Sequence, residues 1–219
     1  MKPSRLPDKV HPGIALALLR SLRDQDTPEE SLEDEAFADS LPRRLGLSDV
    51  VNVQMRRYAD LGDRGQSLAL SEFLDLVRLI SRRPDAQAIF RTAGETLARE
   101  RFANPGPVRR IFRRLYPEGV RRRKLLRSMS SAARALSPGG RVETVPNLPA
   151  MRIENCVLAS AGIHGNACEI LTGALGVCVT EIWDADQSIR HTECLGREGT
   201  CCSWTLIEAP EVGDPTKSG

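Results

Sequence analysis

Three cysteines and one histidine near the end of the chain have the types and spacing of metal ligands. Cys168, His191, Cys194 and Cys202 follow the pattern C-x22-H-x2-C-x7-C. Thiolates and a neutral imidazole are the ligands that tetrahedral zinc takes in proteins. Nothing else in the chain indicates chemistry, because it has no glycine-rich phosphate loop, no Ser/His/Asp order and no HExxH motif. We therefore predict no catalytic residues and no enzymatic activity.

Burial in an apolar core is the alternative to metal binding, because free cysteine behaves as a small hydrophobic residue. All six cysteines lie beyond residue 155. Cys156 and Cys178 occur in apolar runs, and we predict that both are ordinary core residues. Spacing alone leaves metal binding and simple burial equally open for the other positions, and Cys201 competes with Cys202 as the fourth ligand.

Composition predicts an ordinary cytoplasmic globular protein. The 219 residues carry a formal net charge of +2, which argues neither for nor against a nucleic-acid partner. We expect no nucleic-acid partner, because the basic stretch at 109–127 has almost no aromatic residues on which bases could stack. The apolar run at residues 14–19 is too short for a signal peptide, and no stretch has the length of a membrane span. In the cytoplasm the cysteines are expected to be reduced, which favours metal binding over disulfides.

Helical periodicity dominates the first two thirds of the chain. We predict an N-terminal segment at 1–40, with an acidic arm at 24–39 that is exposed or partly mobile, and then a helical part at 41–137. The expected helices lie around residues 50–61, at 71–80 with Ser71 as the N-cap, from Pro84 to before Pro105, at 108–115 and at 119–136.

Strand patterns begin after Pro138-Gly139-Gly140, in a part that we place at 138–209, before a loose tail at 210–219. RVETV and AMRIENCVLA are predicted strands, joined by a turn at 146–149. HGNACEILTGALG is a predicted helix that ends at Gly176. VCVTEIW, SIRHTEC and CCSWTLIEA are predicted as three further strands. The expected fold is α+β, with a helical layer packed on a mostly antiparallel sheet of about four to five strands.

On this layout the metal pattern is geometrically consistent. His191 and Cys194 end one strand, Cys202 begins the next, and Cys168 opens the helix that faces them. A zinc ion bound by all four would have no open position for water, so the predicted Zn²⁺ is structural.

The segment from about Pro138 to Ala209 resembles the 4-vinyl-reductase-type domain, a small-molecule-binding module related to aromatic-sensing domains of bacterial enhancer-binding activators and to the TRAPP-subunit fold. The resemblance lies in the run C-E-I-L-T-G-A-L-G … H-T-E-C … C-S-W. It implies a zinc site on Cys168, His191, Cys194 and Cys202, with His191 where the sensors have a carboxylate. The family has glycine four residues after the second cysteine, where this chain has Glu198.

The resemblance also implies an apolar pocket between the helices and the sheet. We expect a hydrophobic small molecule there, in a sensory or accessory role of a homodimer that signals through a protein partner. A ligand-free homodimeric scaffold and an accessory role in tetrapyrrole (bacteriochlorophyll-type) reduction are the alternatives. The candidate pocket residues are Phe90, Phe112, Tyr116, His164 and Trp183. The basic stretch at 109–127 is predicted to be a solvated helix surface, with anion binding as the alternative.

Overall fold

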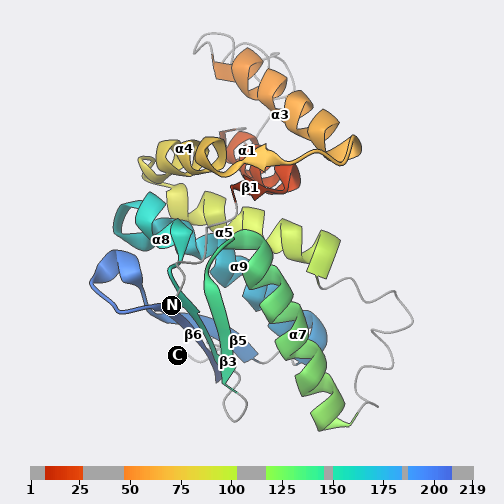
Figure 1. Cartoon of the computed structure of the whole chain (residues 1–219), viewed down its shortest axis with the longest axis vertical. Helices are drawn as coiled ribbons and strands as arrows, with labels where there is room; N and C mark the ends of the chain where they lie inside the picture. The colour runs from red at the N-terminus through yellow and green to blue at the C-terminus, as the bar shows by residue number, and fades with distance from the viewer. Residues whose placement is uncertain (1–7, 27–46, 103–116, 146–149, 184–186, 209–219) are drawn as a thin grey trace, which may run out of the picture.

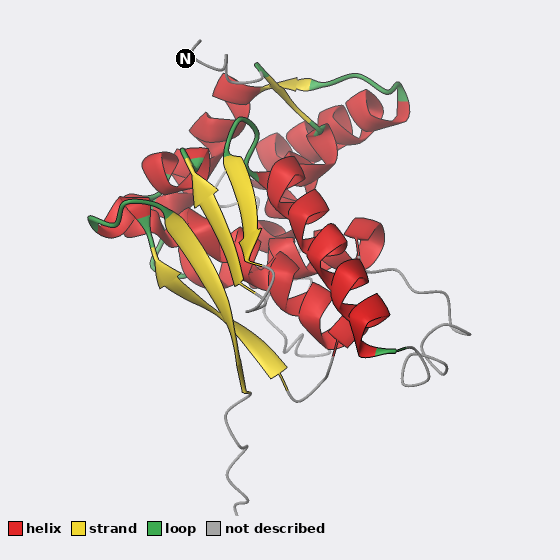
Figure 2. Ribbon diagram, turned by 60° about the horizontal axis from the view of Figure 1, so that its bottom comes forward, coloured by secondary structure: helices red, strands yellow, loops and turns green. Residues whose placement is uncertain are grey.

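The fold is a layer of helices against one face of an antiparallel sheet (Figures 1 and 2). It is seen in a computed structural model, which describes residues 8–26, 47–102, 117–145, 150–183 and 187–208. The α+β architecture predicted from the sequence is confirmed. The predicted helix at 108–115, the turn at 146–149, the tail and the acidic arm beyond Asp26 lie outside the described residues.

The main sheet contains four strands in the order β3-β4-β6-β5, and every neighbouring pair is antiparallel. Its strands are β3 (Arg141–Val145), β4 (Ala150–Glu154), β5 (Gln187–Glu193) and β6 (Cys202–Glu208). The pairing of β5 with β6 shifts between His191 and Glu193, which is a β-bulge near the end of β5. A bulge re-aims the side chains beside it, and here it lies within the predicted metal pattern.

Seven α-helices occur in the described residues. They are α1 (Pro12–Asp26), α3 (Leu47–Asp63), α4 (Leu70–Ser81), α5 (Ala86–Leu97), α7 (Glu118–Leu136), α8 (Val157–Ala161) and α9 (Glu169–Cys178). Two short strands, β1 (Lys9–Val10) and β2 (Leu68–Ala69), pair with each other beside α1 and α4. None of the described helices is both long enough and apolar enough to span a membrane.

Helix α9 is the central element of the helical layer and packs closely on α5 (Figure 1). The two helices approach through glycine on both sides. A Cβ at Gly94 of α5 would overlap the backbone of Ile170, and a Cβ at Gly173 of α9 would overlap the backbone of Arg91. The Arg91 guanidinium also binds the Glu169 carboxylate at 2.6 Å. This crossing fixes the first turn of α9, which Cys168 directly precedes.

The hydrophobic core takes residues from both the helical part and the strand part of the chain. Phe73 and Phe90 from the helices are fully buried, as are Met151 and Trp204 from the sheet. All four belong to one contiguous cluster of buried side chains. The apolar face of the sheet is therefore covered by the helical layer.

Four local predictions are wrong. VCVTEIW is not a strand and Gly176 does not end the preceding helix, since α9 runs through Gly176 to Cys178 and continues as a π-helical turn at Val179–Trp183. α9 is buried on nearly all sides, and an apolar run of this kind does not separate helix from strand by periodicity. The residues VLA after Cys156 form α8, although they were assigned to a strand. Ser71 is not an N-cap, because α4 already begins at Leu70.

Candidate metal centre

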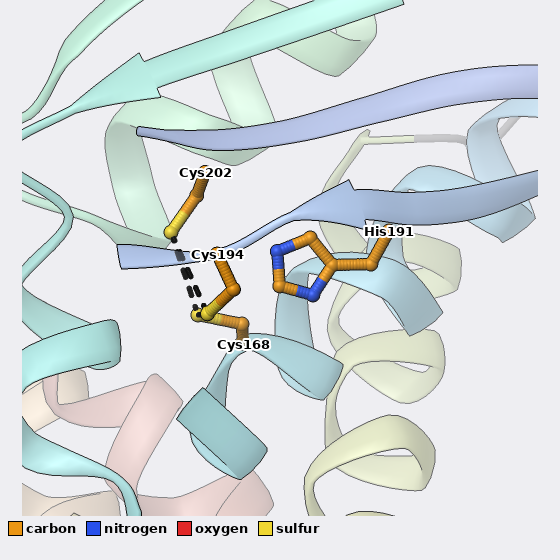
Figure 3. Close-up of side chains that lie close together, drawn as sticks. All are labelled: Cys168, His191, Cys194 and Cys202. Carbon is orange, nitrogen blue, oxygen red and sulfur yellow. Dashed lines mark hydrogen bonds between the residues drawn. The ribbon is translucent and has the colours of Figure 1, made fainter. Parts of the chain in front are cut away.

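The four predicted ligands meet at one edge of the sheet (Figure 3). Cys168 ends a 3₁₀ segment at Ile163–Cys168 and precedes α9, while His191 lies on β5. Cys194 directly follows β5, and Cys202 is the first residue of β6. One ligand atom from each residue lies within 4.8 Å of all the others. Residues separated by more than thirty positions are thus brought to one point.

The three sulfur atoms form an almost equilateral triangle. The Sγ atom of Cys168 lies 3.9 Å from that of Cys202 and 3.9 Å from that of Cys194, and the third side is 4.0 Å. A zinc–sulfur bond of about 2.3 Å in a tetrahedron requires sulfur atoms about 3.8 Å apart. All three cysteines are buried, with 0–2% exposure. The triangle therefore already has the size of one face of a zinc-thiolate tetrahedron.

The imidazole of His191 faces this triangle (Figure 3). Its Nε2 atom is buried and has no hydrogen-bond partner among the described residues. Its Nδ1 atom lies 3.2 Å from Nη2 of Arg197. Because a guanidinium can only donate, Nδ1 is the acceptor of this bond. A buried polar atom without a partner is costly, and a metal ion at the sulfur triangle would give Nε2 that partner.

Trp204 holds the histidine ring in place. The two rings are stacked with centroids 4.4 Å apart and planes 6° from parallel, and they are direct cross-strand partners in the sheet. The Trp204 indole N–H donates to Oγ1 of Thr172 at 3.0 Å, and this hydroxyl donates to the Cys168 carbonyl at 3.4 Å. Trp204 therefore links the histidine on the sheet to the cysteine that precedes α9.

The loop after Cys194 is closed by its own backbone. The Cys194 carbonyl accepts hydrogen bonds from the amides of Arg197 at 2.9 Å and Gly199 at 3.0 Å. Glu198 has a left-handed φ of 67°. Glycine takes this conformation with less strain, and the 4-vinyl-reductase-type domain has glycine at this position. In this chain Glu198 itself adopts the left-handed conformation, which is not shifted to Gly199.

Gly165 makes room for the Cys194 sulfur. It has a φ of 69°, and a Cβ at this position would overlap Sγ of Cys194. The segment that carries Gly165 is attached to α4 by Asn166, whose side-chain amide donates to the Ser81 carbonyl at 3.0 Å. The approach of Cys194 to Cys168 consequently requires glycine at position 165.

Cys201 is not part of the cluster. Its thiol donates to the Glu193 carboxylate at 3.3 Å and interacts with Arg152, whereas the Cys202 thiol faces Cys168 and Cys194. Neighbouring residues of an extended chain point to opposite sides, so only one of the two cysteines can face the triangle. Of the two cysteines that the sequence left open as the fourth candidate ligand, Cys202 is therefore the one in the cluster.

The neighbouring thiols perturb one another. Hydrogen bonding, chiefly with Cys168, holds the pKa of Cys194 below its ordinary value. Hydrogen bonds from Cys156, Cys194 and Cys202 raise the pKa of Cys168.

Cys156 is buried with 2% exposure, which confirms the prediction that it is a core cysteine. The Ser137 hydroxyl donates to its sulfur at 3.6 Å. The prediction for Cys178 is confirmed, and burial raises the pKa of its thiol to about 12.

The candidate pocket residues lie in different environments. Phe90 is fully buried in the core, His164 is exposed beside the metal centre, and Trp183 is half-buried under the guanidinium of Arg121. Phe112 and Tyr116 are outside the described residues. Phe90, His164 and Trp183 line none of the three surface hollows described for this structure.

Comparison with protein-family models, curated proteins and solved structures finds no match to this chain. The resemblance to the 4-vinyl-reductase-type domain therefore stays a prediction that depends on the cysteine–histidine motif. The fold and the site define an α+β domain with a cysteine-rich cluster that could hold a metal ion.

Proposed function

We propose that Cys168, His191, Cys194 and Cys202 bind one structural Zn²⁺ ion. The main support is a triangle of buried sulfur atoms that lie 3.9–4.0 Å apart. A buried imidazole nitrogen, with no hydrogen-bond partner among the described residues, faces this triangle. Three thiolates and one imidazole match the preference of zinc, and four protein ligands fill its tetrahedron. Such an ion has no open position for a substrate, so its role is to stabilise the fold.

The ion would tie together three segments of the chain. These are the 3₁₀ segment before α9, the end of β5 and the start of β6. Structural zinc contributes roughly 10–16 kcal/mol of apparent binding energy in zinc-finger peptides, and such energy supports folding directly. We expect the metal-free protein to keep its helical layer and to lose order at this edge of the sheet.

Native mass spectrometry of the purified protein tests the proposal. We expect one zinc ion per chain in the wild type, no zinc in Cys194→Ser, and full occupancy in the matched control Cys178→Ser, whose buried cysteine lies outside the cluster. A wild-type protein that binds no zinc after incubation with it, or a Cys194→Ser variant that retains it, contradicts the proposal.

A second proposed function is the binding of a hydrophobic small molecule in a sensory or accessory role. The observation that favours it is a hollow of about 500 Å³ beside the metal loop, within the usual range for ligand sites. It is lined by Gly139, Asn155, Cys156, Val157, Ala159, Ser160 and Leu195. Most of these side chains are apolar or small, which suits an apolar ligand.

The same native mass spectra separate this role from its alternatives. A retained small molecule that is lost when Ala159 is replaced by Trp supports ligand binding, because the larger side chain fills the hollow. A homodimer with no retained molecule, unchanged by Ala159→Trp, supports the scaffold role. A retained tetrapyrrole, recognised by its visible absorption, supports the accessory role in tetrapyrrole reduction.

A further inference from the structure

Helix α3 turns one side to the core and the other side to solvent. It packs mainly on α1, with Tyr58 buried and Val51 and Met55 partly buried against the core. On the opposite side Val50 is 60% exposed and Val53 is 54% exposed. These two valines are one helical turn apart, so their side chains form one apolar patch on the surface of the molecule.

The exposed side of α3 also carries a hollow of about 490 Å³. The described residues that line it are Val53, Arg56, Arg57, Asp60, Leu61 and Arg64. Their spacing of i, i+3, i+4, i+7, i+8 and i+11 places them on one face of a helix. Arg64 directly follows α3, and its amide donates to the Asp60 carbonyl at 3.1 Å, as in a further helical turn. We call these six residues, together with Val50, the α3 stripe.

Two of the three arginines in the α3 stripe are available for an external anion. Arg57 binds both carboxylate oxygens of Glu72 on α4, one of them at 3.1 Å, and its charge is thereby compensated. Arg56 donates to the Asn52 carbonyl at 3.4 Å, and neither Arg56 nor Arg64 forms an ion pair among the described residues. Two uncompensated guanidinium groups therefore lie beside exposed apolar side chains.

We propose that the α3 stripe is a docking surface for an acidic amphipathic helix of a partner protein. Such a helix would place apolar side chains against Val50, Val53 and Leu61, and carboxylates against Arg56 and Arg64. The two arginines are about 12 Å apart along the helix axis, so the matching acidic residues lie about eight positions apart on the partner. The inference does not depend on the proposed zinc site, because α3 lies on the opposite side of the helical layer from the sheet (Figure 1).

Three other occupants suit this surface less well. A second copy of the chain would set three arginines and one aspartate against an identical set, and like charges repel. Helices that lie on lipid bury bulky apolar or aromatic side chains, whereas the α3 stripe has two valines and one leucine. Nucleic acid would meet guanidinium groups there, but no aromatic side chain on which bases could stack.

The test is the binding of a synthetic peptide to the full-length protein, measured by fluorescence anisotropy. The labelled peptide is an alanine-based helix with one row of leucine and one row of glutamate, and its control has lysine in place of every glutamate. We expect the acidic peptide to bind and the basic peptide not to bind. Raising the salt concentration from about 50 to about 300 mM should weaken binding several-fold, because exposed ion pairs are screened.

Charge-reversed variants locate the binding surface. Arg56→Glu combined with Arg64→Glu should weaken binding of the acidic peptide about tenfold, and Val53→Ser should weaken it about threefold. All three residues are exposed, so the circular dichroism spectrum should stay unchanged. The matched control is Arg123→Glu combined with Arg127→Glu, which makes the same change of charge at exposed positions of α7 and should bind as the wild type does.

A wild-type protein that does not bind the acidic peptide, or α3 variants that bind it as tightly as the wild type, overturn the inference. Loss of binding in the α7 control also overturns it, because the site would then lie on the basic stretch at 109–127. Phosphatidylglycerol vesicles and duplex DNA are tested alongside. Tighter binding of either one, lost in the charge-reversed α3 variant, would assign the stripe to lipid or nucleic acid. A wild-type dimer that this variant dissociates would assign it to a second copy of the chain.

Discussion

Two regions beside α9, its crossing with α5 and the candidate metal site before its first residue, are held together by different interactions. At the α5–α9 crossing, two regular helices pack through Gly94 and Gly173, and apolar side chains fill the surrounding space. At the metal edge, which comprises residues 163–168 and 191–202, the backbone contains left-handed residues at His164 and Glu198 and a β-bulge. The crossing is defined by the close packing of regular helices, whereas the metal edge consists of short 3₁₀ segments, a closed loop and the irregular end of a strand pair.

The two regions differ in what the proposed ion would contribute. Close-packed helices exclude alternative arrangements by steric contact, so the crossing requires no additional link. The metal edge joins the 3₁₀ segment before α9 to the paired strands β5 and β6, and the four candidate ligands lie where they meet. Cys168 precedes α9 directly, so the rigid crossing positions one ligand and the proposed ion would position the other three relative to it.

The largest expected effect on stability comes from adding a side-chain atom at the α5–α9 crossing. Gly94→Ala places a Cβ against the Ile170 backbone, which cannot rotate away as a side chain can. We expect the free energy of unfolding to fall by about 3 kcal/mol. Gly119→Ala is the matched control, because nothing lies within 4 Å of its added Cβ, and alanine there should be neutral or slightly stabilising. Urea unfolding followed by circular dichroism measures both, and equal midpoints would contradict the close approach.

A pH effect of intermediate size is expected from Cys178, at the end of α9. Burial raises its pKa from the ordinary 9.0 to about 12, so the folded state retains the proton where the unfolded state loses it. Stability contributed by this group is complete below pH 9 and is lost as pH rises toward 12, by about 2 kcal/mol at pH 10.5.

The measurement is the free energy of unfolding at pH 8 and at pH 10.5 for the wild type and Cys178→Ala. We expect a clearly smaller pH-dependent loss in the variant. Tyr58, whose pKa burial raises to about 12, is present in both proteins, so its alkaline contribution cancels in the comparison. Identical losses in the two proteins would show that Cys178 titrates as an exposed thiol does.

Trp204 joins the two regions, and its replacement should weaken both. Trp204→Phe removes the indole hydrogen bond to Thr172 and part of the stacking surface under His191. We expect about 1–2 kcal/mol less stability, together with weaker zinc binding in competition with a chromogenic chelator. Trp183→Phe is the control, since Trp183 is half-buried and is not in contact with the cluster. Unchanged zinc affinity in Trp204→Phe would refute the positioning role.

The smallest expected effect is confined to the metal edge and has the opposite sign. The Arg197 guanidinium occupies Nδ1 of His191 as a donor, although a metal-bound histidine usually donates from its second nitrogen. Arg197→Gln allows Nδ1 to carry a proton and removes a positive charge beside the ion. We expect the zinc-binding free energy to improve by about 0.5–1 kcal/mol, with unchanged affinity in Arg190→Gln, an exposed residue of β5 next to His191. A weaker site in Arg197→Gln would contradict this reading of the contact.

Several features of the site could be predicted because they depend on residue type and local spacing. Four potential ligands lie within thirty-five positions, and the two cysteines and the histidine of the hairpin are close in any antiparallel arrangement of β5 and β6. Trp204, two residues after Cys202, shares its side of the strand and so faces the cluster as well. Strand alternation also separates Cys201 from Cys202 once the register of β6 is fixed.

Other features could not be predicted, because local patterns do not contain them. The helical state of residues 177–183 depends on burial on nearly every side of α9, and an apolar run of that length fits a buried strand equally well. The requirement for glycine at position 165 comes from the sulfur of a residue that lies twenty-nine positions further along the chain.

Residue types and spacing are enough to predict the four candidate ligands and the α+β class, because these follow from residue chemistry and periodicity. The packing of the folded chain adds that Gly165 makes room for the Cys194 sulfur and that Arg197 faces the histidine. Both depend on how the segment before α9 and the β5–β6 hairpin are packed around one point, and packing across long sequence separations leaves no periodic trace in the chain.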